Sequence, residues 1–408
     1  MKIAILTSGI LPVPAVQGGA VENLIDFYLE YNESHRLHDI TVYSVWHPEV
    51  ARHPALNSKV NHYRFIKTKS YLGRLQKFLY QKTHQEGYYH SSIEFFLHKS
   101  IRHLKRQDYD IILLENRPGY ALKIRQVTKA LIVCHLHNEN LTSSVPQCKA
   151  IYEAADGIIT VSDYIKFCVL TINPNDSKTV SVYNGINLNA FSRPAIQIDR
   201  RMYGLNVHDF VLIYSGRINE EKGIMELIET MNLLRDYPAI KLLVIGSSFF
   251  GNDITENDFI QRLKKLARPL GDRIIFTGFV PYAKMPDYLS MADVAVIPSV
   301  WDDPFPTTVL EAQAMGLPII STRRGGIPEE VTPETAILLN TDTRFVSSLA
   351  NAILDLYHHP DKRQAMGKAG LERSELFSKE RYAKEFFEAL EKITHAYAPA
   401  PHPHKSSS

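Results

Sequence analysis

The chain has 408 residues, more than the roughly 250–300 at which a single hydrophobic core stops growing, so we expect two domains. Its hydrophobic fraction of 45% and charged fraction of 22% are those of an ordinary globular protein. The net charge of +2 is too small to indicate nucleic acid as a partner. Three cysteines without metal-ligand spacing predict buried thiols, no disulfide framework and a cytoplasmic protein.

The chain opens with a strand-like run at 2–6, without signal-peptide architecture, and no apolar run approaches the ~20 residues that span a bilayer. Short β-rich apolar runs then alternate with helical patterns. The runs lie at 40–45, 111–114, 131–134, 158–161, 211–214, 242–245, 274–276, 294–297 and 319–321. Continuous apolar runs separated by helices predict parallel strands buried on both faces, and therefore an α/β fold of two doubly wound halves.

The polar stretch 184–207 reads as a linker, because it contains an Asn-Gly pair, a proline and scattered charges. We therefore expect an N-terminal Rossmann-like domain at 1–190 and a second one at 191–376, whose sheet starts at Phe210. A charged amphipathic helix at 377–397 is predicted to pack back on the N-terminal domain. The Pro/His/Ser-rich tail 398–408 is predicted to be disordered.

Gly18 and Gly19 lie in the loop after the first strand, before a helix that is predicted to begin near Val21. Without side chains there, backbone N–H groups can approach a pyrophosphate closely at a helix start. An ordinary turn is the alternative. Only the position after the first strand of a doubly wound sheet favours the ligand-binding interpretation.

Two cations, Arg217 and Lys222, follow the strand-like run 210–214. They should lie beyond the carboxyl end of a strand, where open α/β sheets bind ligands, and they are positioned to hold phosphate. The alternative is a solvated loop in which the intervening Glu220 and Glu221 pair with both cations.

A carboxylate cluster follows the run 294–297. Here Glu311 lies in a helix opened by Pro306, a residue that is favourable at a first helical position. The start of this helix can offer the amides of Thr307 and Thr308 to a phosphate or a sugar oxygen. An ordinary helical glutamate is the alternative for Glu311.

His135 and His137 end the run 131–134, and strand alternation points both to the same side. Two histidines could indicate a metal, but no third ligand of suitable spacing follows, so we expect no metal site. Asp108 and Asp110 form an Asp-x-Asp pattern, yet they precede the strand at 111–114 and so lie at the wrong end of the sheet. They are predicted to form a turn, without metal dependence.

These elements together resemble glycosyltransferase family 4, retaining enzymes with the GT-B fold. The resemblance extends from residue 2 to about residue 395, and it is more specific in the C-terminal half. It rests on the order Gly18-Gly19-Ala20, His137, Gly216-Arg217-x4-Lys222-Gly223 and Asp303-x7-Glu311. The resemblance implies two Rossmann-like domains that face a central cleft.

By resemblance, Arg217 and Lys222 bind the diphosphate of a nucleotide-sugar donor, and Glu311 accepts hydrogen bonds from the ribose hydroxyls. His137 is implied to lie beside the donor sugar near its anomeric carbon, where it contacts a sugar hydroxyl. A structural histidine is the alternative for His137.

Asp303 departs from the family pattern, which usually has Glu at this position, contacting hydroxyls of the transferred sugar. Pro306 stands where Gly is usual. Since Asp is shorter by one C–C bond, about 1.5 Å, either the sugar or the loop must shift to restore contact. This leaves a role open for Asp302, which we interpret as a loop residue.

The resulting hypothesis is a retaining hexosyltransferase of polysaccharide biosynthesis. It would need no cofactor and no metal, and it would move a sugar from a nucleotide diphosphate, most plausibly UDP, to a hydroxyl of a glycan or lipid-linked glycan. The C-terminal domain would hold the nucleotide and the N-terminal domain the acceptor. A catalytically weakened nucleotide-sugar-binding subunit and a sugar-nucleotide epimerase are the alternatives.

The segment 50–85 contains eight Lys or Arg residues and no Asp or Glu, with aromatic residues interleaved. Such a stretch suits an anionic bilayer surface, since each cation near the surface contributes about 1 kcal/mol. Peripheral contact with the inner face of the membrane is one hypothesis. A solvent-exposed charged face is the other.

Overall fold

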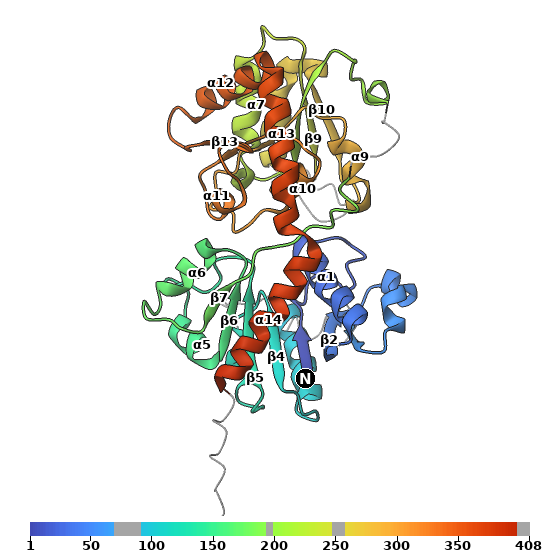
Figure 1. The fold of residues 1–408 in the computed structure, drawn as a ribbon, viewed down its shortest axis with the longest axis vertical. Coiled ribbons are helices and arrows are strands. Elements are labelled where there is room, and N and C mark those ends of the chain that lie inside the picture. Colours follow the sequence, from blue (N-terminus) through green and yellow to red (C-terminus); the bar gives the residue numbers. More distant parts are fainter. Residues whose placement is uncertain (69–90, 193–198, 247–257, 398–408) are drawn as a thin grey trace, which may run out of the picture.

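The computed structural model describes residues 1–68, 91–192, 199–246 and 258–397, which form two α/β units, each built on a parallel sheet (Figure 1). The predicted disordered tail, 398–408, lies outside the described residues. So do residues 69–85 of the basic segment and residues 193–198 of the predicted linker.

The first sheet has seven strands in the order β3-β2-β1-β4-β5-β6-β7. These strands are β1 Lys2–Leu6, β2 Asp39–Val45, β3 Asn61–Ile66, β4 Ile111–Glu115, β5 Leu131–Leu136, β6 Gly157–Thr160 and β7 Thr179–Ser181. The second sheet has six strands in the order β10-β9-β8-β11-β12-β13. They are β8 Phe210–Ser215, β9 Ile240–Ile245, β10 Ile274–Gly278, β11 Val294–Ile297, β12 Ile319–Thr322 and β13 Ala336–Leu339.

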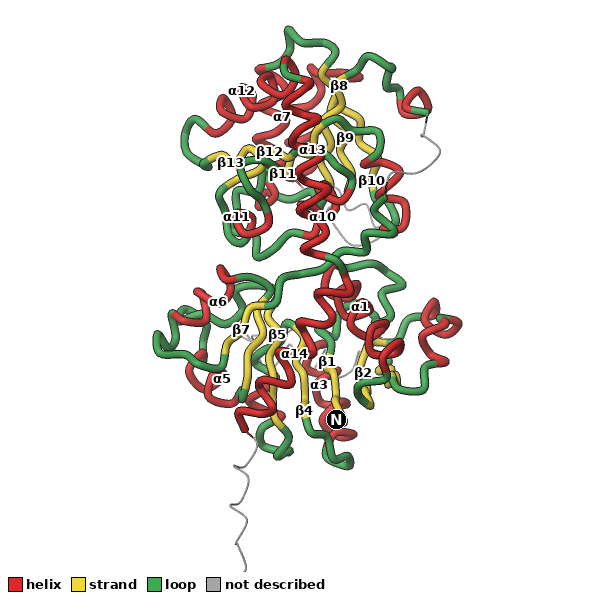
Figure 2. The backbone as a smooth tube through the Cα atoms, viewed as in Figure 1, coloured by secondary structure: helices red, strands yellow, loops and turns green. Residues whose placement is uncertain are grey.

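Helices flank both sheets (Figure 2). In the first unit they are α1 Ala20–His35, α3 Ser91–Leu104, α4 Tyr120–Ile124, α5 Cys148–Ala154 and α6 Asp163–Leu170. In the second unit they are α7 Ile224–Leu233, α8 Asp258–Ala267, α9 Met285–Leu289, α10 Thr307–Ala314, α11 Ile327–Glu330, α12 Phe345–His358 and α13 Pro360–Ser374. The last helix is α14 Lys379–Tyr397. Short 3-10 turns are η1 Pro48–Arg52, η2 Pro54–Asn57, η3 Arg200–Tyr203, η4 Glu220–Lys222, η5 Arg268–Arg273, η6 Tyr282–Lys284 and η7 Glu375–Phe377.

The predicted α/β class is confirmed, because every strand pairing within the two sheets is parallel. In β1 the alternate residues Ile3 and Ile5 pack in one hydrophobic cluster, and Ala4 and Leu6 pack in another. Both faces of the sheet are therefore buried, which explains why its strands read as continuous apolar runs. The predicted runs do not include β3, β7 and β13, each of which lies at an edge of its sheet.

The last helix returns the chain from the second unit to the first. From α13 on the second unit, the chain passes through η7 into α14, which lies along the first unit and packs on α1 (Figure 1). The ring of Phe386 stacks on Tyr28 with centroids 4.3 Å apart. A Cβ on Gly157 would lie 2.6 Å from the side chain of Ile393. A side chain at position 157 of the sheet would therefore clash with α14. The helix begins at Lys379 rather than at Phe377 because residues 375–377 form η7.

The cysteine prediction holds for two of the three thiols. Cys134 and Cys168 are buried, whereas Cys148, the first residue of α5, is partly exposed. All three are free thiols. Within the described ranges, no helix combines the length and the apolar character needed to cross a membrane.

Replacing Phe386 with alanine should destabilise the first unit by about 3–5 kcal/mol, since a buried aromatic ring would leave a cavity beside Tyr28. Urea unfolding of the purified chain measures this change. Lys384→Ala on the exposed face of α14 is the matched control and should change stability by less than about 0.5 kcal/mol. Equal midpoints for Phe386→Ala and wild type would show that α14 is not part of this core.

Candidate active site

The predicted site residues lie at the carboxyl ends of strands, on the edges where the two units meet. Hydrogen bonds between described residues join the units there. Trp301 Nε1 donates to Glu139 Oε1 at 2.9 Å, and Asn184 Nδ2 donates to the backbone oxygen of Phe305 at 3.0 Å. Glu139 follows β5 of the first sheet and Trp301 follows β11 of the second. The structure thus brings the histidine segment and the carboxylate segment together.

The loop after β8 carries the predicted cations, and its last glycine is needed for a close approach. Gly223 has a left-handed conformation, with φ of 69°, and a Cβ there would lie 1.8 Å from the oxygen of Pro298. Only glycine therefore lets this loop approach the segment after β11. Tyr214 braces the same loop, since its hydroxyl donates to the backbone oxygen of Arg217 at 2.7 Å.

The two cations have different partners. Arg217 is half-exposed and lies 3.8 Å from Glu221. Lys222 is mostly buried and forms an ion pair with Asp303, and its Nζ lies 5.4 Å from the ring centroid of Trp301. The solvated-loop interpretation therefore fails for Lys222, whose partner is neither of the intervening glutamates.

Asp303 is buried, and the backbone around it is fixed by a glycine turn. The N–H of Gly326 donates to the backbone oxygen of Asp303 at 2.8 Å. Gly325 is left-handed, with φ of 54°, and a Cβ there would lie 2.1 Å from the same oxygen. The carboxylate that departs from the family pattern thus occupies a fixed place as the counter-ion of Lys222.

Glu311 lies in α10, which begins at Thr307 with Pro306 as the residue before it, one position later than predicted. Its carboxyl is buried, and burial raises its pKa from 4.5 to about 7, against an opposing hydrogen bond from Thr307. The ordinary-helix alternative predicts a solvated glutamate. A buried carboxyl on the side of α10 instead provides a hydrogen-bonding group that is already desolvated.

The glycine loop after β1 faces an acid rather than a cation. Gly18 and Gly19 both have positive φ, 72° and 106°. A Cβ on Gly19 would lie 2.2 Å from the carboxylate of Glu22, whose pKa burial raises to about 7. The loop can therefore approach a ligand closely, but the carboxyl beside Gly19 must be neutral or hydrogen-bonded if that ligand is a phosphate.

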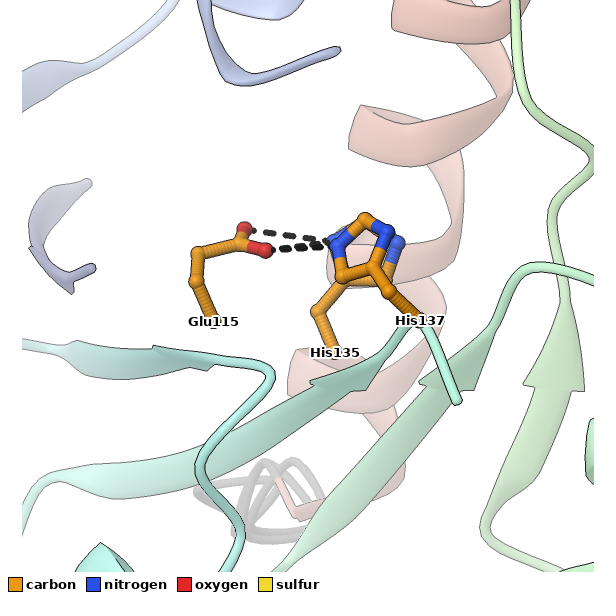
Figure 3. Close-up of side chains that lie close together, drawn as sticks. All are labelled: Glu115, His135 and His137. Carbon is orange, nitrogen blue, oxygen red and sulfur yellow. Dashed lines mark hydrogen bonds and ion pairs between the residues drawn. The ribbon is translucent and has the colours of Figure 1, made fainter. Parts of the chain in front are cut away.

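Glu115, at the end of β4, joins the two histidines (Figure 3). Nε2 of His137 lies 2.9 Å from Oε2 of Glu115, and Nδ1 of His135 lies 3.1 Å from the same oxygen. The hydroxyl of Tyr28 donates to Oε1 at 2.9 Å. Among the described residues, Glu115, His135 and His137 are the one group of His, Cys, Asp or Glu side chains that could jointly hold a metal.

Sequence reasoning missed Glu115 because it sought a third ligand after the histidines, whereas the residue comes 20 positions before His135. The signal was present, since Glu115 directly follows the run 111–114 and is paired with His135 across β4 and β5. Burial raises the pKa of Glu115, but the charge and hydrogen bonds of both histidines outweigh burial and hold it well below its usual range. Burial, with His135 adding to it, lowers the pKa of His137 to about 4.

The Asp-x-Asp pattern lies at the opposite end of the sheet, as predicted. Oδ2 of Asp110 accepts a hydrogen bond from the N–H of Lys2 at 2.7 Å, where β1 and β4 begin. Sequence reasoning also missed Glu329, whose carboxylate accepts hydrogen bonds from the backbone N–H groups of Asp163 and Tyr164 at 2.7 and 2.8 Å. A residue of the second unit thus caps α6 of the first and helps to fix their relative position.

The sequence is similar to those of known glycosyltransferases. The family model for glycosyl transferases group 1 matches residues 195–373. YtcC of Bacillus subtilis is 29% identical over 410 residues, with 97% of this chain and 90% of YtcC covered. Spore coat protein SA of the same organism is 28% identical, with 96% and 100% covered.

The fold also matches solved structures. Anabaena HepE, solved in complex with UDP-glucose, superposes with a TM-score of 0.73 at 20% sequence identity, with 96% of this chain and 100% of HepE covered. The two parallel sheets therefore form a GT-B fold, as predicted. Residues 195–373 thus form a glycosyl transferases group 1 domain, as the resemblance to glycosyltransferase family 4 predicted, and the chain is a glycosyltransferase.

Proposed function

We propose that this glycosyltransferase moves a hexose from a UDP-sugar to a hydroxyl of a glycan or lipid-linked glycan, with retention of anomeric configuration. The observation that carries the proposal is the cation loop after β8, because Lys222 reaches the Trp301 segment that contacts the first unit. The solved complex of HepE with UDP-glucose supports UDP as the nucleotide.

In this proposal Arg217 and Lys222 neutralise the diphosphate as its bond to the sugar breaks. Electrostatic stabilisation of this kind is usually the largest catalytic contribution, and loss of one donor costs roughly 2.7–4 kcal/mol. The acceptor oxygen bonds to C1 on the face from which the diphosphate leaves, and its proton passes to the departing phosphate oxygen. Glu311 accepts hydrogen bonds from the ribose hydroxyls, and the amides of Thr307 and Thr308 serve the phosphates or the sugar.

In this proposal donor binding changes the pairing of Lys222, since Asp303 forms an ion pair with this cation. A diphosphate carries more negative charge than one carboxylate, so it can compete for Lys222 and release Asp303 toward the sugar. The alternative, a subunit that binds the donor without turnover, keeps Asp303 on Lys222. Slow donor hydrolysis in the absence of acceptor favours the enzyme, and binding without any hydrolysis or transfer favours the subunit.

A thermal-shift panel of UDP, GDP, ADP and dTDP without metal tests the donor site. UDP at about 100 times its Kd should stabilise the wild type by about 2.7 kcal/mol, and it should not stabilise Lys222→Met, which keeps the side-chain stem but loses the charge. Arg235→Ala, at an exposed position of the second unit, is the control and should respond as wild type does. If no nucleotide stabilises the wild type, the diphosphate assignment is wrong.

Glu311→Gln tests the buried carboxyl. A folded-state pKa raised from 4.5 to about 7 gives stability that is present below pH 4.5 and lost as pH rises through 7, so a neutral glutamine avoids the loss. Urea unfolding measures this effect. The free energy of unfolding of the variant, relative to that of wild type, should be roughly 2–3 kcal/mol higher at pH 8 than at pH 5. The variant should also bind UDP more weakly at pH 8, because an amide replaces the ribose acceptor.

The control for that experiment is Glu388→Gln, in which an exposed carboxylate is replaced. It should give the same difference from wild type at both pH values. If Glu311→Gln also tracked wild type at both pH values, its carboxyl would be solvated in the free protein, and its role at the ribose would lose its support.

Peripheral membrane contact is the remaining part of the proposal. The described part of the basic segment, residues 50–68, includes the edge strand β3. The four cations of residues 50–68 are all exposed: Arg52, Lys59, Arg64 and Lys67. Exposed Trp46 lies beside them, with the Nζ of Lys67 4.8 Å from its ring centroid. Cations with an adjacent tryptophan suit an anionic headgroup layer.

The chain should sediment with phosphatidylserine vesicles at low salt and remain in solution at 0.5 M salt, a concentration that screens charges within roughly 4 Å. Reversing two charges, with Arg64→Glu and Lys67→Glu, should reduce the bound fraction severalfold. Neutral phosphatidylcholine vesicles and the Arg235→Ala protein serve as controls. If anionic vesicles do not sediment the wild type, the basic face is a solvated surface and the membrane hypothesis is wrong.

A further inference from the structure

The Glu115 carboxylate is hydrogen-bonded to three side chains. Tyr28 reaches it from α1, His135 from β5, and His137 from the loop that directly follows β5. Figure 3 shows the carboxylate approaching both imidazole rings from one side. The side chains of Glu115 and His135 are fully buried, and that of His137 is 5% exposed. The resemblance to glycosyltransferase family 4 implies a place beside the sugar for His137 but gives the other members of this cluster no role.

The distances favour shared protons over a shared metal. A tetrahedral zinc ion with bonds of about 2.0–2.1 Å would hold its ligand atoms roughly 3.3 Å apart. The observed separations from Oε2 of Glu115 are 2.9 Å to His137 and 3.1 Å to His135, which are ordinary hydrogen-bond lengths. The hydroxyl of Tyr28 occupies Oε1 as well, so three donors already satisfy this carboxylate.

This hydrogen-bonding pattern fixes which nitrogen of His137 carries the proton. Glu115 is ionised and can only accept, so the nitrogen that faces it at 2.9 Å, Nε2, must be the donor. In the neutral ring, Nδ1 then has a lone pair and accepts. Among the described residues, none forms a hydrogen bond with Nδ1 of His137.

The segment that carries His137 leads directly to the donor side of the site. Two residues later, Glu139 accepts the hydrogen bond of Trp301, whose ring lies beneath the Nζ of Lys222. The backbone N–H of His137 is itself held by the side chain of Asn116 at 3.3 Å. The segment that follows His137 therefore reaches the cation loop that is proposed to bind the donor.

We propose that Glu115, supported by Tyr28 and His135, is a positioning residue that holds His137 as the Nε2–H tautomer, so that Nδ1 accepts a hydrogen bond from a hydroxyl of the transferred sugar. The inference rests on the proposed function for the identity of that ligand, but not for the tautomer. A neutral acceptor suits this position, because an imidazolium would repel the positive charge that develops on the sugar ring.

The first experiment measures the ring nitrogens directly. The protein is labelled with 15N-histidine, and the signals of His137 are identified by their loss in His137→Gln. In wild type at pH 7 the shifts should show a protonated Nε2 and an unprotonated Nδ1. In Glu115→Gln the new amide can donate to Nε2, so the signals should move toward the Nδ1–H tautomer.

The second experiment measures turnover of UDP-sugar. Glu115→Gln should lower kcat by about 10–100-fold, as loss of a residue that orients another usually does, with the donor KM changed less than threefold. Tyr43→Phe is the matched control, since it removes a buried tyrosine–histidine contact, Tyr43 to His103 at 2.5 Å, elsewhere in the same unit. This variant should keep the wild-type kcat and the wild-type His137 signals.

Several outcomes would overturn the inference. One is a wild-type His137 protonated on Nδ1, which can be observed even if Glu115→Gln fails to fold. Another is a Glu115→Gln protein with unchanged kcat and unchanged ring signals. A third is stoichiometric zinc or manganese in the purified protein whose removal by chelator shifts the His135 and His137 signals. If wild type turns over no donor but has the Nε2–H signals, the proposed function fails and the tautomer assignment stands.

Discussion

The parallel pairing of the strands is the constraint on which the site depends. When neighbouring strands run in the same direction, each loop that follows a strand emerges at the same edge of the sheet. In the first unit this places Glu115 beside His135 and His137, and in the second it places the cation loop beside Asp303. The strand order of each sheet therefore determines its half of the site. The complete site forms where the carboxyl edges of the two sheets meet.

The fold was largely accessible from the sequence because parallel strands buried on both faces leave an unambiguous pattern. Apolar runs such as 294–297 coincide with their strands, and the second sheet begins at Phe210 as expected. The pattern fails at the edge strands β3, β7 and β13, although the edge strand β10 coincides with the run 274–276. In β3, His62 and Arg64 alternate with Tyr63 and Phe65, since an edge strand buries less of its surface, so no continuous apolar run marks this strand.

The candidate site was accessible only as separate motifs. Sequence order shows that Lys222 and Asp303 each follow a strand, but it does not show that they pair, because 81 residues separate them. Glu115 was hidden for the same reason, since the contact that matters runs across strands. The contacts between units, Trp301 with Glu139 and Glu329 with α6, depend on how the two units meet, which no local pattern encodes.

The pair between Lys222 and Asp303 also gives a physical sense to the shorter acid at this position. A buried cation without a partner is costly, and Asp303 is the partner that satisfies Lys222. The tight turn at Gly325 and Gly326 holds the backbone of Asp303 where its short side chain still reaches Lys222. A longer glutamate on the same fixed backbone would have to fold back or extend past the lysine. The aspartate thus balances the charge of Lys222, and under the proposed function it can reach a sugar only after the diphosphate replaces it beside the lysine.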